Sequence, residues 1–80
     1  MEQVITMPKL SSDMQKGILA AWTRQKGDTI SKNDVLFEVE TSKVVSEVQS
    51  TVSGIIKEIY FEEGDEVAVN EPVALIYVDN

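Results

Sequence analysis

Residues 17–36, GILAAWTRQKGDTISKNDVL, recur 37 positions later as GIIKEIYFEEGDEVAVNEPV, residues 54–73. Five positions are identical between the copies: Gly17/Gly54, Ile18/Ile55, Gly27/Gly64, Asp28/Asp65 and Asn33/Asn70. Apolar residues also coincide, at Leu19/Ile56, Trp22/Ile59, Ile30/Val67, Leu36/Val73 and Val39/Ile76. So many matches at one offset indicate an internal structural repeat. The sequence therefore predicts two similar halves.

Each half reads as a series of short strands, because β-branched and aromatic residues are frequent and Gly, Asp or Asn bound each run. Strands are predicted near residues 3–7, 17–24, 28–31, 35–40, 44–49, 54–61, 65–68 and 73–78. No segment has the apolar spacing of a long helix. Two similar four-strand halves predict an all-β, pseudo-twofold sandwich with a shared core.

The glycines of the repeat predict special backbone positions. Gly27-Asp28 and Gly64-Asp65 are turn signals, because glycine adopts positive φ without steric cost. Gly17 and Gly54 begin equivalent strands and indicate bulges or close approaches. The predicted core consists of Val4, Leu19, Trp22, Ile30, Leu36, Val39, Val48, Ile56, Ile59, Val67, Val73 and Ile76. Trp22 is assigned to the core because its repeat mate is an aliphatic residue, and Met7 is expected to be partly buried.

Eighty residues suffice for one small domain, so a single domain covering residues 1–80 is predicted. The chain contains neither cysteine nor histidine. These absences remove the Ser-His-Asp and Cys-His arrangements and the common zinc ligand sets. Glu62, Glu63 and Asp65 beside a turn glycine are typical of a solvated edge, and they lack calcium-loop spacing. We therefore expect neither an enzyme using its own side chains nor a metal site.

Fourteen Asp and Glu residues against seven Lys and Arg give a formal net charge of −7. This charge repels nucleic-acid phosphates and anionic membranes, so neither is an expected partner. It serves solubility or steers the chain toward a basic protein, and both interpretations stay open. Without a basic leader or an apolar run of spanning length, a cytoplasmic location is expected, or the mitochondrial matrix for a mature eukaryotic form.

Between the halves, two alternating strand patterns flank a short polar break at Thr41-Ser42-Lys43. This pattern is typical of a hairpin whose tip presents one long side chain, so Lys43 is expected to be fully exposed. Shifting position 43 by 37 in either direction gives Thr6 and Asn80, near the two chain ends. The repeat therefore predicts that the lysine tip lies opposite the termini.

Over nearly its whole length the chain resembles the lipoyl domains of the acyltransferase components of 2-oxo acid dehydrogenase complexes. The resembling residues are Met7 to Ser11, Gly17, Trp22, Gly27-Asp28, Asp34 to Leu36, Glu38 to Lys43, and Glu63 to Asp65. The resemblance implies a flattened β-barrel, or barrel-sandwich hybrid, of two four-stranded antiparallel sheets. It also implies that lipoate is attached covalently, by an amide bond, to Lys43. The chain departs from the family by carrying Ser42 where Asp commonly precedes the modified lysine.

The resemblance implies a carrier role within a multidomain dihydrolipoamide acyltransferase, with the chemistry belonging to the cofactor. A lipoyl ligase or transferase would load the lysine, and the decarboxylase component would then acylate the swinging arm reductively. The acyl group would pass to coenzyme A at the acyltransferase core, and dihydrolipoamide dehydrogenase would reoxidise the arm. Acetoin-type complexes are among the possible hosts. The isolated domain is expected to be a monomer.

The resemblance further implies that the loop of about residues 11–16 lies beside the modified lysine and helps the decarboxylase recognise the domain. The implied recognition residues are Ser11, Ser12, Asp13, Ser42 and Val44. Two alternatives stay open. A biotinyl carrier has a similar fold, but that family resembles Met-Lys-Met at the tip, unlike Ser42-Lys43-Val44. The other alternative is an unmodified interaction domain of the same fold.

Overall fold

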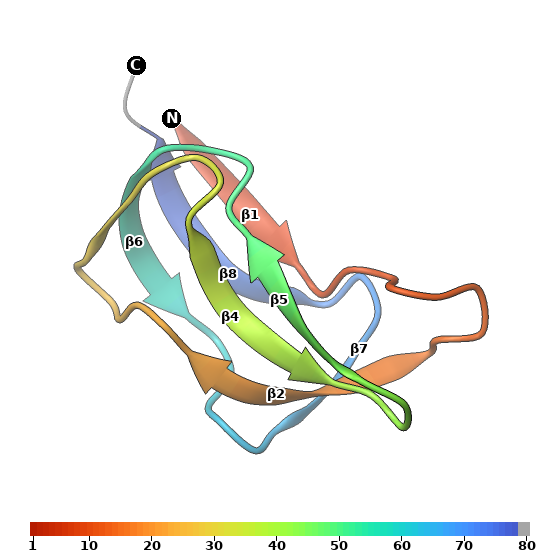
Figure 1. The fold of residues 1–80 in the computed structure, drawn as a ribbon. Helices are drawn as coiled ribbons and strands as arrows, with labels where there is room; N and C mark the ends of the chain where they lie inside the picture. The colour runs from red at the N-terminus through yellow and green to blue at the C-terminus, as the bar shows by residue number, and fades with distance from the viewer. Residues whose placement is uncertain (79–80) are drawn as a thin grey trace.

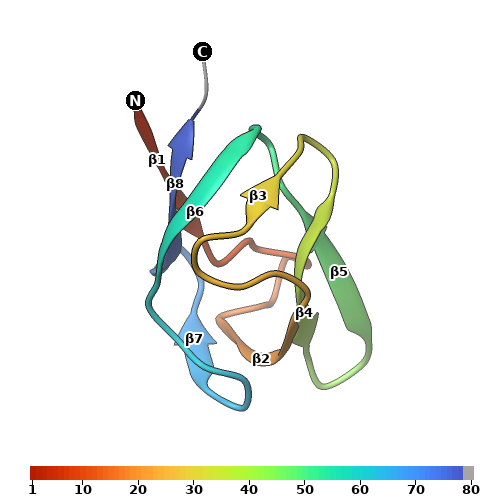
Figure 2. The ribbon, with the colours of Figure 1, turned by 90° about the vertical axis from the view of Figure 1, so that its left-hand side faces the viewer.

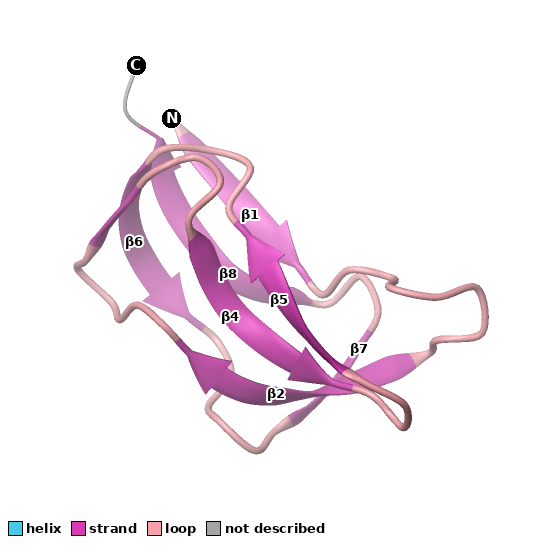
Figure 3. Cartoon of the chain, viewed as in Figure 1, coloured by secondary structure: helices cyan, strands magenta, loops and turns pink. Residues whose placement is uncertain are grey.

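The computed structural model describes residues 1–78, which form eight β-strands and, within that range, no helix (Figures 1 and 3). The strands are β1 Glu2–Thr6, β2 Lys16–Trp22, β3 Thr29–Ile30, β4 Val35–Glu40, β5 Val45–Gln49, β6 Gly54–Ile59, β7 Glu66–Ala68 and β8 Pro72–Val78. All eight predicted strands are present, and their ends differ from the prediction by at most two residues. No helix in the described range is long and apolar enough to cross a membrane.

The strands form two four-stranded sheets, ordered β1-β8-β6-β3 and β5-β4-β2-β7, with every pair antiparallel. The predicted pair of antiparallel sheets is therefore confirmed. The strand pairing within residues 1–78 gives two separate sheets rather than a closed barrel. Apolar side chains between the sheets form the core.

The repeat relates strands of one sheet to equivalent strands of the other sheet. An offset of 37 relates β2, β3 and β4 to β6, β7 and β8, and each sheet takes two strands from each half. The remaining pair, β1 and β5, follows a different offset. Ile5 lies opposite Ala74 as Val48 lies opposite Phe37, which is an offset of 43. The segment between equivalent positions of β1 and β2 is therefore six residues longer than the segment between those of β5 and β6.

One expectation drawn from the repeat, the pairing of Thr6 with Lys43, is wrong. Thr6 is not the repeat mate of Lys43, because the inserted residues shift the register of β1 relative to β5. Asn80, the other proposed mate, lies outside the described residues. The prediction about position is nevertheless confirmed: Met1 and the end of β8 lie at one end of the molecule, and the β4–β5 hairpin lies at the other (Figures 1 and 2). The longest dimension of the molecule is 36 Å.

The predicted turns have the backbone conformation that their residues favour. Gly27 and Gly64 both have a φ of 94°, and the repeat-related Asn33 and Asn70 have φ of 78° and 74°. Asparagine tolerates this left-handed region better than most residues. The Asp65 carboxylate accepts a hydrogen bond from the Glu62 N–H at 2.9 Å, so this acid closes a turn.

Most of the predicted core is confirmed. Eight residues are fully buried: Leu19, Ile30, Leu36, Val39, Ile56, Val67, Val73 and Ile76. Trp22, Val48 and Ile59 are partly buried and pack against them. The Trp22 ring centroid lies 5.1 Å from that of Phe37, and its Nε1–H donates to the Phe61 carbonyl at 3.0 Å. Trp22 thus packs on the core and satisfies its one polar group.

Val4 is the wrong core prediction, because this residue is 47% exposed. Successive side chains of a strand point to opposite faces, and in β1 it is Ile5 that faces inward. Met7 is more buried than expected, with no exposed surface. Phe37 and Ala74 are also buried although unpredicted, each beside an inward-facing neighbour. Register shifts at Val35/Phe37 and Ile5/Thr6 accompany these consecutive buried residues.

One ion pair on the outside of the first sheet gives a pH-dependent prediction. Glu2 on β1 pairs with Lys57 on β6, and their hydrogen bond holds the pKa of Glu2 below and the pKa of Lys57 above their usual values. Because the folded pKa of Glu2 is lowered, its contribution to stability is present above the ordinary glutamate pKa. That contribution is lost as the pH falls through the folded pKa.

Lys57→Met is expected to raise the pKa of Glu2 toward the ordinary glutamate value, as measured by NMR titration. High salt should have the same effect on the parent, because the pair is exposed and screened. Lys26→Met removes another lysine, one that pairs with Glu58 instead, and should leave the Glu2 titration unchanged. An identical Glu2 titration in the parent and in Lys57→Met would refute this prediction.

Candidate functional site

Lys43 lies in the four-residue turn Thr41–Val44, which connects the end of β4 to the start of β5. The Thr41 N–H donates to the Val44 carbonyl at 2.9 Å, next to the last strand pair, Glu40 with Val45. Lys43 projects from this turn with 77% of its side chain exposed. The prediction of an exposed lysine at a hairpin tip is confirmed.

The packing of β4 gives the hairpin a firm base. Phe37 and Val39 of β4 are buried in the core, and β4 pairs with β2 on one side and β5 on the other. β5 is an edge strand whose Val45 side chain is 58% exposed. The tip is therefore held by a buried strand and extends beyond the sheet into solvent.

A second segment lies beside the tip: the β1–β2 loop, residues 7–15, which contains the six extra residues. Met14 anchors this loop, because the residue is buried and its sulfur accepts the Leu10 N–H at 3.2 Å. Gly17 leaves room for the anchor. A Cβ at Gly17 would lie 3.0 Å from Met14 Cε and 2.6 Å from Val39 Cγ1, so the expected close approach is confirmed.

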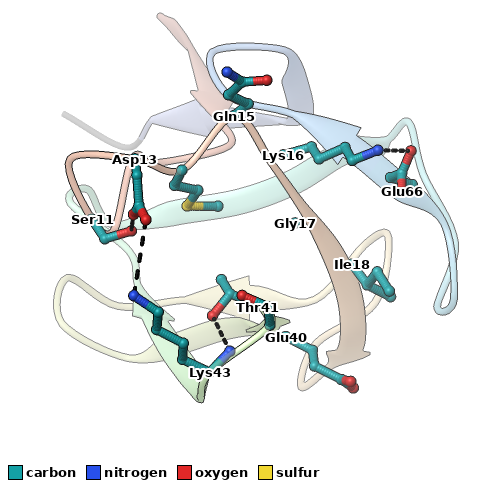
Figure 4. A pocket seen from close by; sticks show the side chains of 12 residues that line it. Ser11, Asp13, Gln15, Lys16, Gly17, Ile18, Glu40, Thr41, Lys43 and Glu66 are labelled. Carbon is teal, nitrogen blue, oxygen red and sulfur yellow. Dashed lines mark hydrogen bonds and ion pairs between the residues drawn. The ribbon is translucent and has the colours of Figure 1, made fainter.

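Asp13 connects the loop to the tip (Figure 4). The Ser11 hydroxyl donates to Asp13 Oδ1 at 2.9 Å, and Asp13 Oδ2 lies 3.9 Å from Lys43 Nζ. Both charged side chains are mostly exposed, at 73% and 77%. Such a pair contributes under about 1 kcal/mol, so it orients the amine without immobilising it.

The loop and the hairpin enclose an open hollow of about 470 Å³, floored by Gly17 and Ile18 of β2. Of the residues predicted from the sequence, Ser11, Asp13, Ser42 and Lys43 line it. Ser12 and Val44 are exposed near the same end but do not line the hollow. The structure thus brings the two predicted segments together, whereas the recognition role of these five residues stays a prediction.

Sequence reasoning assigned no role to Met14 or Thr41, both of which line this site. Met14 stands in a polar loop, and only its burial against Gly17 and Val39 shows that it anchors the loop. Thr41 offered a signal, since threonine at the start of a turn commonly hydrogen-bonds to the backbone two or three residues later. Its hydroxyl accepts the Lys43 N–H at 3.4 Å and the Val44 N–H at 3.3 Å.

The chemistry available at the tip is that of an accessible primary amine. Within residues 1–78, no group of three His, Cys, Asp or Glu side chains is placed to hold a metal ion. The full sequence provides no histidine or cysteine to act as a base or a second nucleophile beside the amine. The arrangement suits covalent attachment of an acyl group to Lys43 Nζ by a separate enzyme, because another active site can surround the tip.

Met14→Ala is expected to lower the free energy of unfolding by about 2 kcal/mol, because it leaves a cavity where the loop is anchored. Hydrogen exchange should accelerate at the amides of residues 11–13 and stay unchanged at residues 41–44. Leu10→Ala, in the same loop but 40% exposed, is the control and should cost less than about 0.5 kcal/mol. Equal losses in the two variants would show that Met14 does not anchor the loop.

The family described as "Biotin-requiring enzyme" matches residues 3–76. The chain is 35% identical over 72 residues to the dihydrolipoyllysine-residue succinyltransferase component of a 2-oxoglutarate dehydrogenase complex from Staphylococcus saprophyticus. It is 40% identical over 76 residues to a pyruvate dehydrogenase E1 component subunit beta from Rhizobium meliloti. These alignments cover 90% and 94% of this chain but only 17% and 16% of the two relatives.

Among solved structures, the chain is similar to the lipoyl domain of the 2-oxoglutarate dehydrogenase complex from Azotobacter vinelandii. The TM-score is 0.77 at 30% identity, and the match covers 92% of this chain and 94% of that domain. The likeness therefore extends over both chains almost completely.

Proposed function

This chain belongs to the family of biotin- and lipoyl-attachment domains, and from that premise we propose that Lys43 carries lipoate through an amide bond. The observation that carries the proposal is the exposed amine of Lys43 at the tip of a hairpin, opposite Met1 and the end of β8. A group that must enter other active sites needs this placement. Burial would block both loading and use.

Lipoate is favoured over biotin by the relatives. The chain matches a solved lipoyl domain over nearly the full length of both, and a relative is named for a dihydrolipoyllysine residue. The tip sequence Ser42-Lys43-Val44 also differs from the Met-Lys-Met that biotinyl carriers resemble. A biotinyl carrier and an unmodified interaction domain are the two alternatives.

Attachment forms a bond between Lys43 Nζ and the carboxyl carbon of an activated lipoyl group, whose leaving group departs as the amine gives up protons. A lipoyl ligase or transferase supplies the activated group. The uncharged amide changes the formal net charge of the chain from −7 to −8. It also ends the ion pair with Asp13, which requires the ammonium.

Bound lipoate would supply a dithiolane that takes up an acyl group together with an electron pair and later releases both. The residues of this chain present and orient that group. The hairpin extends it from the end opposite Met1 and the end of β8, and the β1–β2 loop places Ser11 and Asp13 beside it. The domain itself needs no catalytic side chain.

We further propose that the partners are those of a 2-oxo acid dehydrogenase complex. The decarboxylase component would acylate the arm, the acyltransferase core would transfer the acyl group to coenzyme A, and dihydrolipoamide dehydrogenase would reoxidise the arm. Tethering raises the local concentration of the arm at each site without tight binding. The location would be that of the complex, the cytoplasm or the mitochondrial matrix.

The proposed host is a multidomain dihydrolipoamide acyltransferase, in which residues 1–80 would form one carrier domain. The succinyltransferase relative supports that host, and the dehydrogenase beta-subunit relative shows that a matching segment also occurs in another component. The chain spans about a sixth of either relative. An acetoin-type complex is a further possible host.

Co-expression with a lipoyl ligase and lipoate, followed by intact mass measurement, tests the cofactor. A parallel culture supplies a biotin ligase and biotin instead. We expect one lipoyl increment in the first culture and no increment in the second. A biotin increment without a lipoyl one would select the biotinyl carrier. No increment in either culture would select the unmodified interaction domain.

A further inference from the structure

The turn that carries Lys43 lacks the backbone conformation of a tight hairpin turn. The favoured two-residue hairpin turns need positive φ at one or both central residues, which is why glycine and asparagine are common there. Within residues 1–78, positive φ occurs only at Gly27, Asn33, Gly64 and Asn70. Ser42 and Lys43 therefore form the tip with negative φ, a conformation that matches the strand twist less well.

The hydroxyl of Thr41 supplies the hydrogen bonds that close this turn. The Val44 N–H would close a regular turn by donating to the Thr41 carbonyl, but here it donates to the Thr41 hydroxyl at 3.3 Å. The Lys43 N–H points to the same oxygen at 3.4 Å (Figure 4). The hydroxyl in turn donates to the Val44 carbonyl at 3.2 Å. One side-chain oxygen thus engages three backbone groups of a four-residue turn.

We propose that Thr41 is a positioning residue for the attachment at Lys43: its hydroxyl closes the turn and sets the direction in which the lysine leaves the hairpin. Thr41 touches neither the amine nor the incoming acyl group, so it acts through the backbone of Lys43 and Val44. The inference rests on the proposed function, because it concerns how Lys43 is presented to the active site of the loading enzyme.

Thr41 and Asp13 contact different parts of the lysine. Asp13 contacts the lysine through the ammonium, and this contact ends when the amide forms. The Thr41 hydroxyl forms its hydrogen bonds with backbone groups, which amide formation at Nζ does not alter, so these bonds persist after loading. The same turn direction therefore serves both the unmodified and the modified domain. Threonine also suits the role because branching at Cβ restricts χ1 and keeps the hydroxyl aimed at the turn.

Thr41→Val and Thr41→Ser form a matched pair for the test. Valine keeps the shape and removes the hydroxyl, whereas serine keeps the hydroxyl and removes the branch. Thr51→Val is the control, because Thr51 is an exposed threonine in the connection between β5 and β6, at the other end of β5. Thermal unfolding of each purified, unmodified variant verifies that it is folded.

Two measurements follow on each variant: hydrogen exchange at the Lys43 and Val44 amides, and steady-state loading by a lipoyl ligase. Thr41→Val should speed exchange at both amides and raise KM for the domain about fivefold with kcat unchanged, the size of one lost hydrogen bond. Thr41→Ser should lie within about twofold of the parent. Thr51→Val should match the parent in both measurements.

Parent-like exchange and parent-like KM in Thr41→Val would overturn the inference. So would a Thr41→Ser variant as impaired as Thr41→Val, since the branch rather than the hydroxyl would then position the lysine. If the parent itself is not loaded, the proposed function fails, and the exchange measurement still decides whether the hydroxyl closes the turn. The two failures are thus distinguishable.

Discussion

Lys43→Arg is expected to abolish lipoyl attachment completely. Arginine keeps the positive charge and the reach of the side chain, so it preserves the ion pair with Asp13 and the folded hairpin. Its guanidinium stays protonated and does not act as the amine nucleophile that amide formation needs. Intact mass after co-expression with a lipoyl ligase and lipoate should therefore show the unmodified mass only.

Lys16→Arg is the matched control for that variant. Lys16 lines the same hollow, its side chain is 62% exposed, and it pairs with Glu66 at 3.3 Å. It offers a ligase another accessible amine close to the tip. The control should accept one lipoyl group as the parent does. Loading of Lys43→Arg, or loss of loading in Lys16→Arg, would contradict the assignment of Lys43 as the attachment site.

Gly54→Ala is expected to lower the free energy of unfolding by about 3 kcal/mol or more. A Cβ at Gly54 would meet the Tyr77 carbonyl oxygen, and it would lie 2.9 Å from the Tyr77 carbonyl carbon and 3.0 Å from Val78 Cα. These are backbone atoms of β8, which pairs with strands on both sides. β8 cannot move away from the added Cβ without disturbing the sheet. Urea denaturation measures the resulting loss in the free energy of unfolding.

Gly27→Ala is the comparison for that measurement. Gly27 has a φ of 94°, but a Cβ there would meet no atom within 4 Å. The substitution should cost about 1–2 kcal/mol, from backbone strain alone. A cost at Gly27 that equals or exceeds the cost at Gly54 would contradict the close approach between β6 and β8.

The repeat explains why so much of the fold was predictable. Glycines and apolar residues at one offset locate equivalent strands, and the close approaches predicted at Gly17 and Gly54 are both present. The left-handed turns at Gly27 and Gly64 were predictable because few residues other than glycine adopt this backbone conformation. Lys43 was identifiable as a tip residue for a local reason, because two alternating patterns stop on either side of it.

Other features depend on contacts between distant segments, which a local pattern does not contain. Val4 and Ile5 are adjacent apolar residues, and only the pairing of β1 with β8 determines which one faces the core. The six-residue insertion in the β1–β2 loop was hidden because residues 8–13 have no counterpart in the second half. Met14 looks like an ordinary loop residue until Gly17 and Val39 are placed beside it.

The central claim is that Lys43, and no other lysine of this chain, carries lipoate. The most direct test is peptide mass mapping of the domain after loading by a lipoyl ligase, with each lysine-containing peptide assigned. The lipoyl increment should appear on the peptide containing Lys43 and on no other. A lipoyl increment on any other lysine, with the Lys43 peptide unmodified, would contradict the claim.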